Sequence, residues 1–254
     1  MLVLTHNRTN VVANNVDRYV ESTMPNIFHT SDLHGSYHSL LTQLAQIENL
    51  NIWVDTGDFF PNKTRGTSVE KSYQTKWALE WTKIAHRIAE ICMKRNICVV
   101  SVSGNHDYVS LANLLRVAGM SANNVFDLSS ASHSATVHGI KFAGFREIPY
   151  IAGEWAGETE IGGFKDIMNT AMAHNPDVLV THCPPGGILD HAHGDGHFGV
   201  PYITSYLMNA PHSVKAHLFG HVHGDGGLTK TEGDILFSNA AAIHTGNVLG
   251  EMGQ

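Results

Sequence analysis

The chain has 254 residues, of which 43% are hydrophobic and 15% are charged, so its composition is that of a folded globular protein and excludes the disordered class. It carries 16 basic and 23 acidic residues, a net charge of −7, and no run rich in Lys or Arg. We therefore expect no duplex nucleic acid as a partner, because duplex binding depends on a broad basic surface.

The cysteines and the hydropathy of the chain indicate the cellular compartment of the protein. The three cysteines form no Cys-x-x-Cys pair, which favours a reducing compartment. No stretch approaches the roughly 18 apolar residues of a membrane span, and residues 1–21 lack the apolar core of a signal peptide. We expect a cytoplasmic protein without membrane contact. The 18 histidines are unusual, and many are flanked by Gly, Asp or Asn in loops, where imidazole is a common metal ligand.

From residue 26 onwards, apolar runs alternate with amphipathic stretches of helical period, which predicts an α/β protein. Residues 1–25 are interpreted as a leader without an assigned role, and residues 26–254 as a single domain. Hairpins are predicted around His138-Gly139 and between the last two strands. The predicted strands are 26–30, 51–55, 97–102, 124–126, 135–137, 140–145, 178–180, 215–219, 228–231 and 235–238, and the predicted helices are 37–48, 73–94, 111–118, 163–174 and 200–209.

Short polar motifs follow the first two strands of the predicted domain. Asp32 and His34 are two residues apart, so their side chains leave the same face of an extended backbone. Asp58 comes after the next strand and after Gly57, which lets the backbone turn, while Asp55 at the end of that strand is an alternative. Each motif by itself also fits an ordinary surface turn.

Three later strands end in similar motifs. The sequence Gly-Asn-His-Asp places an amide oxygen at Asn105 beside His106, which can give or take a proton near neutral pH. His182 lies where two prolines stop a strand. His221 and His223 are again two residues apart on an extended segment, and so present one face.

Together these strand-end residues predict a metal centre. The carboxyl ends of strands that run in the same direction meet at one rim of an α/β protein, where ligands bind. The combined set of nitrogen and oxygen ligands is too large for one ion. It has the size that two ions require when a carboxylate bridges them at roughly 3.5–4 Å.

The order of these motifs, Asp-x-His, Gly-Asp, Gly-Asn-His-Asp, His and Gly-His-x-His, resembles the calcineurin-like metallophosphoesterase superfamily between residues 27 and 240. The resemblance implies a four-layer α/β/β/α sandwich that holds two divalent ions. Mn is favoured, with Fe, Zn, Co or Ni as alternatives, because ligand type alone does not choose among them. It implies one ion on Asp32, His34, Asp58 and His223 and a second ion on Asp58, Asn105, His182 and His221.

The resemblance also implies a reaction. A hydroxide that bridges the two ions would attack phosphorus, and the ions would stabilise the charge of the transition state. His106 would act as the general acid that protonates the leaving oxygen, and Asp107 would hold His106.

Within the superfamily, the C-terminal half is similar to the small MPPED-type phosphodiesterase branch. The similar segments are Thr-His-x-Pro-Pro at 181–185, His-Leu-Phe-Gly-His-x-His at 217–223 and Phe-x-Asn-Ala at 237–240. This similarity implies a small phosphodiester or nucleotide substrate, including cyclic nucleotides. Cys183 replaces the usual Gly, and neither the Gly-rich segment from His191 to His197 nor residues 1–25 have a matching segment in that branch.

Two other functions stay open at this stage. A phosphomonoesterase or protein phosphatase is one, although Asp58 is not followed by the Asp-Arg-Gly of the protein phosphatases. The other is a non-catalytic nucleotide-binding or scaffold protein of the same fold, although no predicted ligand and no proton donor is missing here. The sequence does not indicate an oligomeric state.

Several accessory residues are weaker candidates. Arg146 and Tyr150 begin a long irregular loop that could close over the substrate, and we predict that they contact it. Residues 61–72 are predicted to form a long polar loop, and its Lys63 and Arg65 are either phosphate contacts or solvated surface charges. The loop at 186–199 resembles a metal-binding tract by composition, but its histidines also fit a solvated loop. These histidines are His191, His193 and His197.

Overall fold

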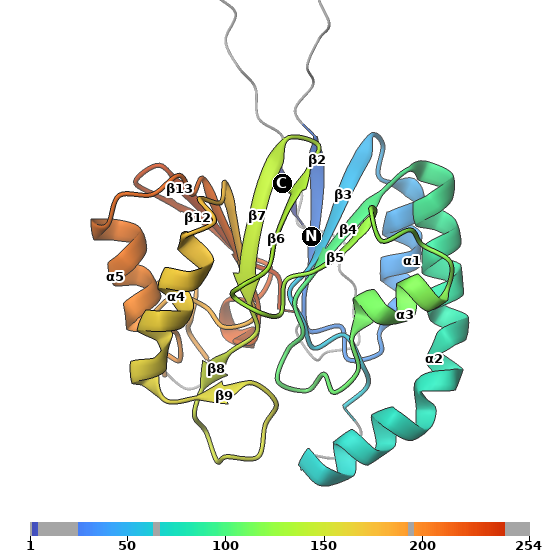
Figure 1. Cartoon of the computed structure of the whole chain (residues 1–254), viewed down its shortest axis with the longest axis horizontal. Helices are drawn as coiled ribbons and strands as arrows, with labels where there is room; N and C mark the ends of the chain where they lie inside the picture. Colours follow the sequence, from blue (N-terminus) through green and yellow to red (C-terminus); the bar gives the residue numbers. More distant parts are fainter. Residues whose placement is uncertain (1, 5–24, 63–66, 193–195, 242–254) are drawn as a thin grey trace, which may run out of the picture.

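The computed structural model of the protein describes residues 2–4, 25–62, 67–192 and 196–241. These residues form two large sheets and a short two-stranded one, which confirms the predicted α/β class. Figure 1 shows the two large sheets facing each other, with α1, α2 and α3 beside the first sheet and α4 and α5 beside the second.

The first sheet has the strand order β1-β2-β3-β4-β5. Strands β2 to β5 are parallel, and β1 pairs antiparallel with β2. Residues 2–4 belong to the segment predicted as a leader, and their backbone pairs with residues 27–29 at the edge of this sheet. The elements of this half are β1 (Leu2–Leu4), β2 (Asn26–Thr30), α1 (Tyr37–Gln46), β3 (Leu50–Asp55), α2 (Thr67–Arg95), β4 (Cys98–Ser101), α3 (Leu111–Val117) and β5 (Val125–Asp127).

The second sheet has the order β12-β13-β11-β10-β7-β6, with four parallel central strands and antiparallel strands at both edges. Both predicted hairpins are confirmed, because β6 pairs with β7 and β12 with β13. The elements of this half are β6 (Ser134–Val137), β7 (Ile140–Phe145), β8 (Ile148–Pro149), β9 (Glu158–Thr159), η1 (Ile161–Gly163), α4 (Phe164–Met172), β10 (Val178–Thr181), α5 (Pro201–Asn209), β11 (Ala216–Phe219), η2 (His223–Asp225), β12 (Thr229–Glu232) and β13 (Ile235–Asn239).

Alternating side chains along the strands explain how the layers pack. Trp53 belongs to the apolar cluster shared with α1, α2 and α3, whereas its neighbour Val54 belongs to a cluster shared by both sheets. In the second sheet, Leu218 faces the first sheet and Phe219 faces the cluster shared with α4 and α5. Parallel strands covered on both faces read as continuous apolar runs, which is why their positions were predictable.

The start of α2 differs from its prediction. The helix begins at Thr67 rather than at Tyr73, so part of the stretch predicted as a loop is helical. Its first two turns are mostly polar, and Val69 and Tyr73 are too few apolar residues to reveal a helix in the sequence. They are helical because Glu70 and Gln74 are fully buried and form hydrogen bonds with the segment 106–108.

A buried histidine links the two sheets beneath the strand ends. His29 of β2 has its Nδ1 2.9 Å from the hydroxyl of Ser238 in β13 and its Nε2 3.1 Å from the hydroxyl of Thr56. Its burial lowers its pKa to about 3, so the folded protein holds it neutral at pH 5.

This histidine should make the folded state less stable in acid. The unfolded chain protonates residue 29 below its ordinary pKa of about 6.5, while the folded chain does not, so stability falls as pH drops from about 6.5 towards 3. Between pH 7 and pH 5, wild type should lose about 2 kcal/mol more than His29→Gln, whose amide does not titrate. Urea unfolding with a chelator present measures the difference, and parallel pH profiles for the two proteins would contradict it.

Candidate metal centre

The predicted ligands lie on loops at the carboxyl ends of parallel strands from both sheets. The registers Thr30 to Asp55 and Asp55 to Ser101 align the ends of β2, β3 and β4, so the loops that follow them meet. Four of these ligands adopt a left-handed backbone that is uncommon outside Gly and costs of order 1–3 kcal/mol in strain. They are Asp32 (φ 53°), His34 (φ 43°), Asp58 (φ 54°) and His221 (φ 68°).

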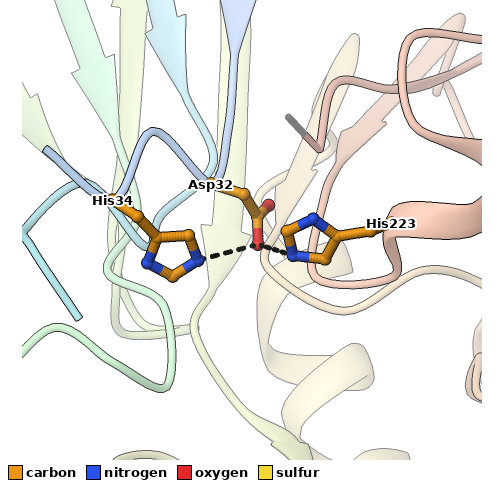
Figure 2. A group of neighbouring side chains, drawn as sticks. All are labelled: Asp32, His34 and His223. Atoms are coloured by element: carbon orange, nitrogen blue, oxygen red, sulfur yellow. Dashed lines mark ion pairs between the residues drawn. The ribbon is translucent and has the colours of Figure 1, made fainter. Parts of the chain in front are cut away.

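Asp32, His34 and His223 form the first ligand group. Figure 2 shows the carboxylate of Asp32 between the two imidazoles, with its Oδ1 3.2 Å from Nε2 of His223 and 3.9 Å from Nε2 of His34. The other oxygen, Oδ2, accepts hydrogen bonds from the Ser31 hydroxyl at 2.6 Å and the His221 amide at 2.9 Å. Asp32 and His34 follow a strand of the first sheet, and His223 follows a strand of the second.

Asp58 and His182 form a second group together with Asp32. Oδ2 of Asp58 lies 3.5 Å from Nε2 of His182 and 3.8 Å from Nε2 of His34, so this oxygen is close to an imidazole of each group. Its Oδ1 accepts a hydrogen bond of 2.8 Å from the amide of His106. The side-chain oxygen of Asn105 lies 2.9 Å from Nε2 of His182, which brings the amide ligand to the same place.

The charges at this centre are balanced between carboxylates and imidazoles. Burial alone would lower the pKa of His182, but the carboxylate of Asp58 raises it to about 9. Burial raises the pKa of both Asp32 and Asp58, and the facing imidazoles outweigh it, so both carboxyl pKa values lie below their usual range. Burial lowers the pKa of His221 to about 4, which leaves its ring neutral beside His182 at a centroid distance of 4.9 Å.

These residues fit a pair of divalent ions. Within the described part of the chain, Oδ1 of Asp32 is a buried oxygen whose neighbours are two imidazole nitrogens, Nε2 of His223 and Nε2 of His34. An ionised carboxylate oxygen in this position costs free energy unless a cation compensates it. Nδ1 of His182 lies 2.7 Å from the carbonyl oxygen of Thr56, so Nε2 would be the ring nitrogen available to bind a metal ion.

The prediction that Asp107 holds the His106 ring is wrong. Asp107 was predicted to hold this ring, but its carboxylate accepts hydrogen bonds from the amides of Gly104 at 2.8 Å, Phe59 at 3.3 Å and Phe60 at 3.2 Å. Asp107 therefore ties the loop after β3 to the loop after β4. Burial and the charge of Asp58 raise the pKa of its carboxyl.

Glu70 takes the place that was predicted for Asp107. Nδ1 of His106 lies 3.0 and 3.1 Å from the two carboxylate oxygens of Glu70, which is fully buried. Burial alone would lower the pKa of His106, but Glu70 and Asp58 raise it. Gln74, one turn later on α2, hydrogen-bonds the His106 carbonyl and accepts a bond of 2.8 Å from the Tyr108 amide. The four-residue spacing of Glu70 and Gln74 was the available sequence signal, and the loop prediction obscured it.

The accessory candidates have different positions. Arg146 donates through Nη2 to the carbonyl oxygens of Gly104 at 2.8 Å and Asp107 at 2.9 Å, so this side chain braces the loop after β4. Tyr150 is 55% exposed, and its contact with substrate stays a prediction. Lys63, Arg65 and His193 lie outside the described residues.

The structure shows the surroundings of Cys183 and of three residues in the loop that follows it, Asp190, His191 and His197. Cys183 is fully buried and burial raises its thiol pKa, so it packs in the core without a reactive thiolate. Nδ1 of His197 lies 2.7 Å from Oδ1 of the buried Asp190, while the His197 side chain is 62% exposed. His191 packs against His197 with a ring distance of 5.5 Å. Asp190 also accepts the amides of Gly187 and Gly199, so it organises this loop.

Among the described residues, no helix is both long and apolar enough to cross a membrane.

Comparison with known proteins identifies the family. A UPF0046 protein of Caenorhabditis elegans is 35% identical over 77 residues, which cover 30% of this chain and 25% of that protein, so the match spans about a quarter of the relative's length. A solved crystal structure is similar in fold, with a TM-score of 0.57, 15% identity, and coverage of 84% of this chain and 89% of that one. The family model described as calcineurin-like phosphoesterase matches residues 25–225. The chain therefore belongs to the calcineurin-like phosphoesterase family.

Proposed function

We propose that this protein is a dinuclear metal-dependent phosphodiesterase that acts on small nucleotide substrates, including cyclic nucleotides. The observation that carries the proposal is the position of Asp58, whose Oδ2 lies between Nε2 of His34 and Nε2 of His182 at 3.8 and 3.5 Å. A carboxylate oxygen between two imidazole groups is suited to bridge two ions. The net charge of −7 favours a compact substrate over duplex nucleic acid.

The proposed ions have distinct ligand sets. Asp32, His34 and His223 would hold the first, Asn105, His182 and His221 the second, and Asp58 both. Two bound divalent ions, with Mn favoured, would supply Lewis acidity towards the phosphoryl oxygens and lower the pKa of water. This chain's own residues would orient the ester at the carboxyl ends of the strands, where the ligand loops meet.

His106 is the proposed proton donor. Its Nδ1 is held by Glu70, so Nε2 is the ring nitrogen that would give a proton to the leaving oxygen. The raised pKa of His106 keeps its ring protonated at higher pH than an ordinary imidazole, which suits a general acid. Glu70 acts through His106 and is a positioning residue.

We also assign the protein to the MPPED-type phosphodiesterase branch of the family, because the segments at 181–185 and 217–223 are similar to that branch. Three apolar clusters, one between the sheets and one beyond each sheet, support the four-layer α/β/β/α arrangement. We propose a cytoplasmic location because the cysteines are unpaired thiols.

The test compares two esters of the same leaving group. The Mn-loaded protein should hydrolyse bis-p-nitrophenyl phosphate at least about 10-fold faster than p-nitrophenyl phosphate, and chelation should abolish both activities because the ions supply the charge stabilisation. Faster hydrolysis of the monoester would instead support a phosphomonoesterase. Hydrolysis of neither ester by protein that binds metal would favour a non-catalytic nucleotide-binding protein.

A further inference from the structure

A partly exposed tryptophan lies beside the proposed proton donor. The ring of Trp155 is 4.6 Å from the ring of His106, with the planes inclined by 59°. His34 approaches His106 at 5.3 Å in an edge-on arrangement, and Glu70 binds its Nδ1. Glu70, His34 and Trp155 are thus neighbours of the His106 ring, and the indole ring lies nearer to it than the ring of His34.

The segment that carries Trp155 is held in place by hydrogen bonds that its backbone amides donate. We call residues 150–157 the aromatic loop. The amide of Ala156 donates to the carbonyl of Asn105 at 3.2 Å, which fixes the aromatic loop to the loop of the predicted ligands. The carboxylate of Glu158 accepts the amide of Trp155 at 3.1 Å and those of Ile151 and Ala152 at 2.7 and 2.8 Å. An aromatic ring held in this way binds a ligand with little loss of conformational entropy.

The exposure of Trp155 distinguishes it from a core residue. Trp53 is fully buried and Trp81 is 8% exposed, as expected for side chains that only pack. Trp155 packs against the apolar cluster of the second sheet but remains partly exposed, and Ile151 on the same loop is 56% exposed. One side of the indole therefore contacts the protein core while another part is accessible from solvent.

We propose that Trp155 forms a stacking platform for the leaving group of the substrate, and that this leaving group carries a nucleobase or another planar aromatic ring. The inference rests on the proposed function, because His106 would protonate the leaving oxygen and whatever borders His106 then borders the leaving group. Indole stacks on any planar π-system, so this contact selects aromatic rings without selecting one base.

The first test measures binding and needs no turnover. Calorimetric titration of the Mn-loaded protein compares adenosine 5′-monophosphate with ribose 5-phosphate, two ligands with the same phosphate group that differ chiefly in the base. Wild type should bind the nucleotide at least about 10-fold more tightly, because stacking on an aromatic side chain contributes this much per base. Trp155→Ala should remove the difference, and Trp155→Phe should keep most of it.

The matched control is Ile161→Ala, which changes an apolar side chain that is 55% exposed outside the aromatic loop and should leave both affinities unchanged. If Trp155→Ala binds the nucleotide as tightly as wild type, or if wild type does not distinguish the two ligands, the proposal is wrong. If the Ala variant unfolds locally, Trp155→Phe still tests the proposal, because it should keep most of the difference in affinity between the two ligands.

The second test measures turnover of 2′,3′-cyclic adenosine monophosphate and of 1-O-methylribose 2′,3′-cyclic phosphate, which has the same leaving oxygen but no base. Trp155→Ala should raise KM for the nucleotide about 10-fold with kcat unchanged, and should leave the base-free substrate unaffected. An equal fall in kcat for both substrates would overturn the proposal, because Trp155 would then only support His106. Hydrolysis of no ester at all would refute the proposed function, and the binding comparison would still decide the role of Trp155.

Discussion

Asp58→Asn should reduce hydrolysis of bis-p-nitrophenyl phosphate by about 1,000-fold and lower the metal content from two ions to one or none per chain. Asn has almost the same shape as Asp, and its side-chain oxygen can still accept the His106 amide that Oδ1 accepts in wild type. The substitution removes the negative charge that faces imidazoles of both ligand groups. Loss of several kcal/mol of charge stabilisation in the transition state corresponds to this factor.

Activity and metal content of the gel-filtered protein are measured together, with Asp55→Asn as the matched control. Asp55 is the same residue type three positions earlier and is also buried, but its oxygens accept the Thr30 hydroxyl at 2.7 Å and the Gly57 amide at 3.2 Å. Burial raises the pKa of Asp55 well above its usual value, so a neutral amide is a close substitute. Two ions and full activity in Asp58→Asn would contradict the bridging role.

Glu70→Gln should lower kcat about 100-fold for an ester with an alkoxide leaving group, such as 2′,3′-cyclic adenosine monophosphate. The Glu70 carboxylate holds the His106 ring through both oxygens and raises the pKa of this ring. The neutral Gln amide would hold the ring less firmly and would raise its pKa less. General acid catalysis contributes about 10²–10⁴ when the leaving group needs a proton. Removing the carboxylate lowers the pKa of His106, so the alkaline limb of the kcat profile should move to lower pH.

Esters of p-nitrophenol provide an internal control, because p-nitrophenolate leaves without a proton and its release should slow less than 10-fold. The matched variant is Glu90→Gln, which makes the same change at an exposed position of α2 and should leave kcat unchanged. Equal losses for both kinds of leaving group would mean that Glu70 supports only the structure of the loop. A thermal unfolding scan of each variant separates that outcome from general destabilisation.

Local patterns in the sequence predict the class of the fold and the order of its main strands and helices, but not the short strands β1, β8 and β9. Buried parallel strands and amphipathic helices have periodicities that are local properties of the chain, so β3, β10 and β11 were found within one or two residues of their ends. The strand-end motifs were visible for the same reason, since Asp32-x-His34 and the Gly-Asn-His-Asp segment are contiguous.

Which groups support the site depends on tertiary contacts. Glu70 is 36 residues from His106 along the chain and belongs to a mostly polar stretch, so no local pattern paired them. Asp107 is adjacent to His106 in sequence, yet its side chain turns to the amides of Gly104, Phe59 and Phe60. Adjacency in sequence does not make two side chains hydrogen-bond partners, because a hydrogen bond requires a suitable direction and distance in the folded chain.

The same limit applies to the approach of the two sheets. The contact between Asp32 and His223 joins residues from different sheets, and its distance of 3.2 Å depends on how the apolar faces between the sheets pack. The sequence identified both residues as ligand candidates, because each follows an apolar run. The contact between Trp155 and His106 could not be predicted from the sequence around either residue. It depends on the hydrogen bonds that tie the aromatic loop to Asn105 and Glu158. The sequence therefore shows which residue types can bind a metal ion, whereas the distances between them depend on how the folded chain packs.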